Sequence, residues 1–125
     1  MPIINYVLVQ KPIEERLIDA ACIYWDVERS YFFRKAGSYM KTKDSKPSEI
    51  VYRKSVIYYL IKNNTTYSYD FIAKIFGLRS HQPVIRLIDN LEATKGIIKQ
   101  HFNDINQIQH LSDKLDASIV QYDIR

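Results

Sequence analysis

The chain contains one cysteine, three glycines and four prolines among its 125 residues. A single cysteine excludes an intrachain disulfide framework, and we expect Cys22 to be a buried, inert thiol. So few glycines and prolines argue against a low-complexity chain and against a β protein with many turns. No apolar run approaches the ~20 residues of a membrane span, and the start "MPIINYVLVQKP" has no signal-peptide pattern. We therefore expect a folded, mainly helical, soluble protein of the cytoplasm.

Familiar catalytic and metal-binding motifs are also missing. The three histidines, His81, His101 and His110, lie far apart and have no cysteine or carboxylate at a ligand spacing such as HExxH. The sequence has no GxSxG, no glycine-rich dinucleotide turn and no GxxxxGK[ST] phosphate loop. The expectation is a protein that is not an enzyme and that binds no metal, nucleotide or other cofactor.

Positive charge is concentrated in one window of the chain. The net charge is +4, but residues 29–62 hold nine basic and two acidic residues, so this window is +7 and the rest is −3. A basic block within a slightly acidic domain is typical of proteins that bind a phosphate backbone. A solvated lysine loop without a partner fits the charge pattern equally well.

The apolar pattern predicts one all-α domain of about six helices over residues 13–115. Extended arms are expected on either side, at residues 1–12 and 116–125, because "IINYVLV" and "SIVQYDI" are rich in β-branched residues. These arms could pair with each other or across a homodimer. The first helix, after Pro12, places apolar side chains on one face: Ile13, Leu17, Ala20, Ala21 and Tyr24.

Capping residues and apolar spacing predict the next elements. Asp26 is expected to cap a short helix over residues 27–36, which Phe32 and Phe33 anchor to the core. Pro47 opens a helix over residues 47–64 whose buried residues are Ile50, Ile57, Leu60 and Ile61. The last helix, over about residues 97–115, is expected to turn five apolar residues inward: Ile98, Phe102, Ile105, Ile108 and Leu111.

Between these two long helices the pattern predicts a helix-turn-helix. Ser68 caps a helix of about eight residues, Gly77 turns the chain, and Ser80 caps a second helix with Pro83 in its first turn. The second helix buries Val84, Leu87, Ile88 and Leu91. Helical spacing then leaves Gln82, Arg86 and Asp89 on the opposite face, with His81 and Ile85 at its edge. Such a face can enter a major groove ~12 Å wide.

The stretch "IAKIFGLRSHQPVIRLI", residues 72–88, resembles the signature of the C-terminal DNA-binding domain (domain IV) of the bacterial replication initiator DnaA. The matching positions are Ile72-Ala73, Phe76-Gly77, Arg79, His81 and Val84-Ile85. Order and spacing are similar over roughly residues 13–113. The resemblance implies a fold like that of DnaA domain IV and the Trp repressor. It also implies sequence-specific binding of double-stranded DNA in replication initiation, in transcription regulation or as a mobile-element accessory factor, at a bacterial nucleoid.

The resemblance assigns roles to individual positions of this chain. Arg53 corresponds to the family's minor-groove arginine and His81 to its base-contacting histidine. With them we assign base readout to Ser80, Gln82 and Arg86. Phosphate contacts are assigned to the basic residues Lys41, Lys43, Lys46, Lys54 and Arg79.

Two departures from the family pattern bear on specificity. Ser80 stands where initiators commonly have aspartate, and Gln82-Pro83 replaces two hydroxyl residues. Because glutamine can bond adenine through two hydrogen bonds, the preferred site is expected to differ from the initiator box. The chain also has no room for an ATPase module, so the resemblance covers the DNA-binding domain alone. The alternative to DNA binding is a protein-interaction module on the same scaffold that has lost base readout.

Overall fold

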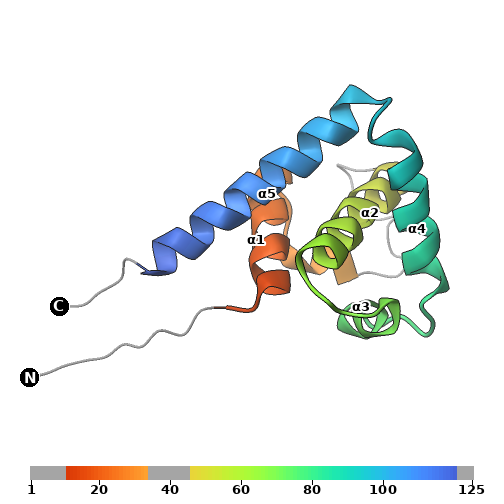
Figure 1. Ribbon diagram of the computed structural model, residues 1–125, viewed down its shortest axis with the longest axis horizontal. Coiled ribbons are helices and arrows are strands. Elements are labelled where there is room, and N and C mark those ends of the chain that lie inside the picture. The colour runs from red at the N-terminus through yellow and green to blue at the C-terminus, as the bar shows by residue number, and fades with distance from the viewer. Residues whose placement is uncertain (1–10, 34–45, 121–125) are drawn as a thin grey trace, which may run out of the picture.

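The computed structural model describes residues 11–33 and 46–120, with the backbone alone for residues 116–120. The regular structure in this part of the chain is all helical, without a strand (Figure 1). The all-α prediction is therefore confirmed. The described residues form five α-helices: α1 (Ile13–Trp25), α2 (Pro47–Asn64), α3 (Tyr69–Ile75), α4 (Gln82–Thr94) and α5 (Lys99–Val120). A short 3-10 helix, η1 (Arg29–Phe33), comes after α1.

Helix α2 is the centre of the fold. It packs against each of the other helical elements, with α1 and α5 on one side and α4 on the other (Figure 1). Its residues 55–61 are all buried, as is Ile50, so the prediction of Ile50, Ile57, Leu60 and Ile61 as core residues is confirmed. A helix that is covered on all sides must be apolar around its whole circumference, which residues 55–61 nearly are. The other helices are arranged around this central segment.

Helices α1 and α5 form the layer that covers one side of α2. Helix α1 buries Leu17, Ile18, Ala20 and Ala21, and its alanines allow a neighbouring helix to approach closely. From α5 the carboxylate of Asp104 is buried among them. It accepts hydrogen bonds from the hydroxyls of Tyr24 at 2.7 Å and Tyr52 at 2.6 Å, and from the amide of Gln100 at 2.7 Å. One buried acid therefore joins α1, α2 and α5.

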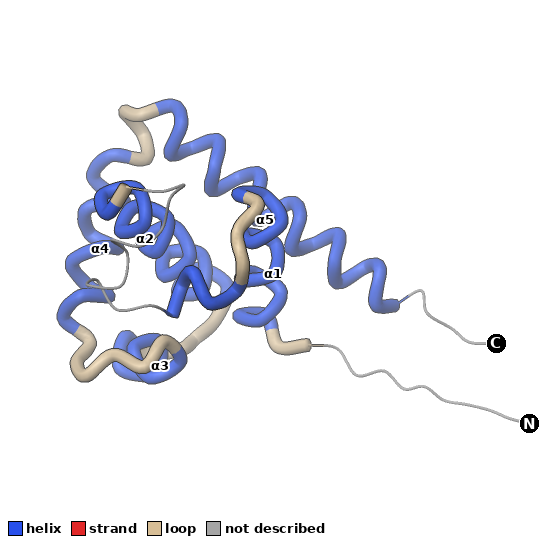
Figure 2. The backbone as a smooth tube through the Cα atoms, turned by 180° about the vertical axis from the view of Figure 1, so that it is seen from behind, coloured by secondary structure: helices blue, strands red, loops and turns tan. Residues whose placement is uncertain are grey.

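Helix α3 lies across the ends of α2 and α4 in both views of the backbone (Figures 1 and 2). It packs on both helices and buries Ile72 and Ala73. The predicted pair of helices around Gly77 is thus attached to the central helix along α4 and at α3. The outer surface of the pair remains exposed to solvent.

Asp26 and the helix predicted after it differ from expectation. Asp26 ends α1 in the left-handed conformation, at φ 56° and ψ 55°, and so does not cap another helix. Aspartate tolerates this conformation better than most residues because its short side chain bonds locally. The next element is the five-residue 3-10 helix η1, in which Phe32 is buried. Phe33 is 36% exposed and stacks on Phe76, with 5.1 Å between the ring centroids. Its ring is therefore only partly packed against the core.

The last helix also departs from the prediction. Helix α5 begins at Lys99, and Ile98 and Phe102 are exposed instead of buried. Its buried stripe is Asp104, Ile108 and Ser112, with Ile105 and Leu111 beside it. Asp104 faces the core because its carboxylate accepts the hydrogen bonds from Tyr24 and Tyr52. The helix continues through Val120, so residues 116–120 of the predicted C-terminal arm are helical and not extended. Continuing an existing helix costs little per residue, whereas a short strand without a partner is unstable. Residues 1–10 of the N-terminal arm and residues 121–125 lie outside the described residues.

Candidate nucleic-acid interface

The corner between α3 and α4 is built from local backbone interactions. The Ser68 hydroxyl accepts a hydrogen bond from the Phe71 N–H and starts α3, as predicted. At the other end Gly77 adopts φ +71°. The Gly77 N–H bonds to the Lys74 carbonyl at 3.1 Å and the Leu78 N–H to the Ala73 carbonyl at 2.9 Å. This is the Schellman termination that a left-handed glycine permits, and the predicted turn at Gly77 is confirmed.

Helix α4 divides into a buried and an exposed face. Val84, Ile88 and Leu91 are buried, and Leu87 is partly buried. The residues predicted for the outer face, Gln82, Arg86 and Asp89, are all exposed. The apolar stripe therefore fixes which side chains α4 presents to solvent.

The start of α4 lies one residue later than predicted. The helix begins at Gln82, and His81 occupies the N-cap position without a side-chain capping bond. Ser80 is exposed, and its hydroxyl accepts a hydrogen bond from the Gln82 N–H at 3.1 Å. Serine satisfies the first backbone donor from just outside the helix, because a hydroxyl can bond the N–H two residues ahead. Arg79, also exposed, precedes it in the same turn.

His81 has a partner that no sequence pattern singles out. Its Nδ1 lies 2.8 Å from Oδ1 of Asp70, in the first turn of α3. An acid at that place in a helix is expected only to favour the positive end of its own helix. The pairing depends on the angle between α3 and α4, which places the first turns of both helices beside each other. Helical spacing within either helix carries no information about that angle.

Arg53, predicted to read the minor groove, is held by aromatic side chains of α1 and η1. Its guanidinium lies over the Trp25 ring at 5.1 Å and over the Tyr31 ring at 5.8 Å from the centroid. It donates to the Tyr31 hydroxyl at 3.1 Å and pairs with Glu49 at 3.4 Å. Only 17% of the side chain is exposed. To reach a groove, Arg53 would have to give up some of these contacts.

The residues predicted to contact phosphates fall into three groups. Lys46, at the N-cap of α2, and Arg79 are exposed. Lys54 is half-buried, and burial lowers the pKa of its amine to about 8. Lys41 and Lys43 lie outside the described residues.

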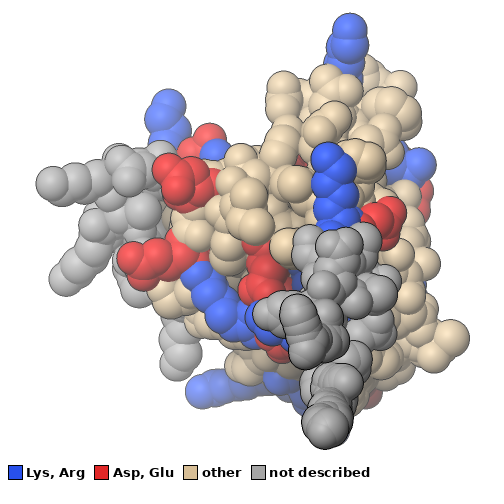
Figure 3. Space-filling model, turned by 90° about the vertical axis from the view of Figure 1, so that its left-hand side faces the viewer, with Lys and Arg blue, Asp and Glu red and all other residues tan. Residues whose placement is uncertain are grey.

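The α3–α4 pair itself carries no net charge. Residues 69–94 contain three basic residues (Lys74, Arg79 and Arg86) and three acidic residues (Asp70, Asp89 and Glu92). Figure 3 shows a different side of the molecule, the left-hand side of Figure 1 and away from α4, where basic and acidic side chains lie intermingled over the part not covered by grey atoms. Attraction to a polyanion must therefore come mainly from basic residues outside this helix pair.

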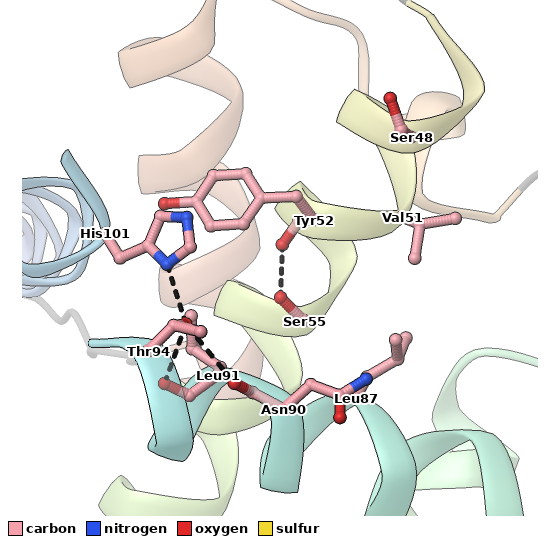
Figure 4. Close-up of a pocket in the computed structure, with 9 residues that line it drawn as sticks. All are labelled: Ser48, Val51, Tyr52, Ser55, Leu87, Asn90, Leu91, Thr94 and His101. Carbon is pink, nitrogen blue, oxygen red and sulfur yellow. Dashed lines mark hydrogen bonds between the residues drawn. The ribbon is translucent and has the colours of Figure 1, made fainter. Parts of the chain in front are cut away.

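A second surface feature is an apolar groove between α2 and α4, closed at one end by the start of α5. Its volume is about 220 Å³, and Val51, Leu87 and Leu91 are among the apolar residues that line it (Figure 4). At the α5 end the His101 ring stacks on Tyr52, with centroids 4.4 Å apart, and its Nδ1 is 2.9 Å from the Thr94 hydroxyl. Three large apolar side chains near this end are exposed: Ile97, Ile98 and Phe102.

No family model, curated protein or solved structure matches the chain. The geometry of the α3–α4 corner is therefore the main guide to function. In the described part of the chain no group of three or more His, Cys, Asp or Glu residues is arranged to hold a metal ion. Nor does any described helix combine the length and apolar character needed to cross a bilayer.

Cys22 is half-buried, beside the core. Burial raises the pKa of its thiol, and nearby Asp19 raises it further. Since the thiolate is the reactive form, this environment disfavours nucleophilic chemistry at Cys22.

Proposed function

We propose that the chain binds double-stranded DNA in a sequence-specific manner, with the first turn of α4 in the major groove. One observation carries the proposal. The buried stripe of α4 leaves Ser80, Gln82 and Arg86 exposed at one end of the helix, beside Arg79 and the partly exposed His81. These are the donor-bearing and acceptor-bearing side chains that recognise base edges and phosphates.

The dimensions of the corner support this role. A 13-residue α4 is about 20 Å long and, with its side chains, about as wide as a major groove. Its C-terminal half is held against α2 by Ile88 and Leu91, so the first turn is presented by a rigid support. Position and rigidity together allow a few side chains to distinguish one base pair from another.

In this proposal the exposed residues make different contacts with DNA, some to base edges and others to phosphates. Gln82 can bond adenine at N6 and N7, and Arg86 can bond guanine at O6 and N7. Arg79 and Lys46 contact phosphates, as Lys41, Lys43 and Lys54 would. Arg53 enters the minor groove only if binding releases some of its contacts with Trp25, Tyr31 and Glu49.

The resemblance of residues 72–88 to DnaA domain IV gives the proposal its biological setting. We propose a helix-turn-helix protein of the bacterial cytoplasm, acting in replication initiation, in transcription regulation or as a mobile-element accessory factor. It would act without an enzymatic step or a cofactor. Symmetric operators would require a homodimer, for which the terminal arms are the proposed contacts.

The test is selection of bound sites from a random duplex pool, and then binding measurements on the selected sequence and its single-base variants. Replacing Gln82→Ala should reduce the preference for adenine at one position by about 5- to 150-fold, because a bidentate contact contributes about 1 to 3 kcal/mol of discrimination. The matched control is Gln107→Ala, an exposed glutamine on α5. It should bind like the wild type.

Two outcomes would contradict the proposal in different ways. If Gln82→Ala weakens binding to every sequence equally, Gln82 is not a reader. If no duplex is retained at about 50 mM salt, where nonspecific phosphate contacts are strong, the chain does not bind DNA.

The second candidate function is a protein-interaction module. The α2–α4 groove and the exposed Val51, Ile97 and Phe102 favour it, since exposed apolar side chains that lie close together commonly mark interaction sites. The neutral charge of residues 69–94 is also compatible with this role. Indifference to DNA at low salt would favour it over DNA binding.

A further inference from the structure

The Asp70–His81 pair joins the exposed starts of two helices. Asp70 lies in the first turn of α3 and His81 at the N-cap of α4, and Oδ1 and Nδ1 are 2.8 Å apart. The His81 side chain is 41% exposed and that of Asp70 is 69% exposed. The ring is therefore held on one side and accessible on the other.

The chemistry of the pair determines which ring nitrogen carries the proton. An ionised carboxylate only accepts hydrogen bonds, so at this distance the proton must be on Nδ1 of His81. In a neutral imidazole the second nitrogen, Nε2, then has no proton and is an acceptor. Without the carboxylate, nothing at this contact would favour that tautomer.

We propose that Asp70 is a positioning residue that makes His81 a reader of base amino groups, an inference that rests on the proposed DNA-binding function. As an acceptor, Nε2 bonds the N6 amino group of adenine or the N4 amino group of cytosine. It has no favourable contact with guanine O6 or N7, thymine O4 or a phosphate oxygen, all of which are acceptors. The preferred duplex thus presents an adenine or cytosine amino group in the major groove at the position that His81 reaches.

The first test uses the free protein. Long-range proton–nitrogen NMR spectra distinguish the two tautomers of each histidine, and His101 and His110 serve as internal references. In the wild type His81 should be in the Nδ1–H form. Asp70→Ala should shift it towards the Nε2–H form, which free histidine prefers. Asp70→Asn should also shift it towards the Nε2–H form, because the asparagine amide can donate a hydrogen bond to an unprotonated Nδ1.

The second test measures the affinity ratio between duplexes with and without the amino group at one position. The ratio should fall about fivefold in both Asp70→Ala and His81→Ala, the value for one net hydrogen bond, with no further fall in the double variant. Asp70→Asn should lower the ratio as well, because its amide favours the other tautomer of His81. Both Asp70 variants lose a negative charge near the DNA and should bind all sequences somewhat more tightly, so the ratio, and not the affinity, is the readout.

Asp113→Ala, which removes an exposed acid from α5, is the control for lost charge and should change no ratio. Circular dichroism melts show whether each variant folds. An Nε2–H tautomer in the wild type overturns the inference. So does a preference for guanine at the position, or an unchanged ratio in Asp70→Ala with DNA binding intact. Failure to retain any duplex overturns the proposed function and this inference together.

Discussion

Gly77 is favoured by its backbone conformation, and not by a lack of space for a side chain. The position has φ +71°, and a Cβ added there would meet no atom within 4 Å. Gly96 also has open space around its Cβ position, but its φ does not lie in the left-handed range. Because a Cβ would meet no atom at either position, comparing the two glycines isolates the cost of a left-handed backbone.

We expect Gly77→Ala to lower the free energy of unfolding by about 1 kcal/mol or somewhat more, the cost of a left-handed conformation for a residue with a Cβ. Gly96→Ala should be neutral or stabilising by up to about 1 kcal/mol, because alanine restricts the unfolded chain. Urea unfolding of both variants provides the measurement. Equal changes in the free energy of unfolding for the two variants would show that the left-handed conformation of Gly77 does not stabilise the α3–α4 corner.

Residue type alone identifies one of the two left-handed positions among the described residues. Gly77 is predictable because glycine is rare in this chain and favours positive φ. Asp26, at φ 56°, is missed because aspartate is also a frequent N-cap residue and the sequence does not distinguish the two roles. A similar ambiguity places the α4 cap at Ser80, although its hydroxyl does bond the first helical N–H.

At the scale of helices, apolar spacing predicts elements well wherever one face alone is buried. The bounds of α2 and the buried faces of α1 and α4 agree with the structure. In α5 the spacing predicts the buried Ile108 correctly, with Ile105 and Leu111 beside the core, but it misplaces Ile98 and Phe102, which are exposed, and misses the buried Asp104. The Asp70–His81 contact could not be predicted either, since it depends on the angle between two helices. Long-range polar pairs of this kind leave no pattern in a single sequence.

The Asp104 network gives a prediction for the joint between α1, α2 and α5. Asp104→Ala should lower the free energy of unfolding by about 2 to 3 kcal/mol, because it leaves the hydroxyls of Tyr24 and Tyr52 without their acceptor. Asp104→Asn keeps one acceptor oxygen and should cost less. Asp113→Ala, an exposed acid on the same helix, should change the free energy by no more than about 0.5 kcal/mol. If Asp104→Ala matched this control, the network would not hold the helices together.

The same network predicts how stability depends on alkaline pH. Burial and the bond to Asp104 raise the pKa of Tyr24 to about 12, and the same causes raise that of Tyr52. Folded protein thus keeps phenolic protons that the unfolded chain loses near its ordinary tyrosine pKa of about 10. The stabilisation is complete below about pH 10 and is lost as the pH rises towards about 12. In Asp104→Asn, where the carboxylate charge is gone, denaturant unfolding at a series of pH values should show a smaller loss over this range.

For the molecule as a whole, the distribution of charge constrains how DNA could be bound. The α3–α4 pair is neutral, whereas residues 29–62 carry a charge of +7. Base readout and phosphate attraction would then come from different parts of the chain. Variants in the two parts should have distinguishable effects on binding.

Lys46 offers the sharpest test of this separation, because it is exposed at the N-cap of the central helix. If Lys46 contacts one phosphate, Lys46→Gln should lower the slope of log affinity against log salt by about 0.9 and weaken binding to all sequences alike. Lys114→Gln, on α5, which packs on α1 and α2, should leave the slope unchanged. Titrations of one selected and one unrelated duplex at several salt concentrations give both quantities. A slope that Lys46→Gln does not alter would place the phosphate contacts elsewhere, and a loss confined to the selected duplex would make Lys46 a reader of sequence.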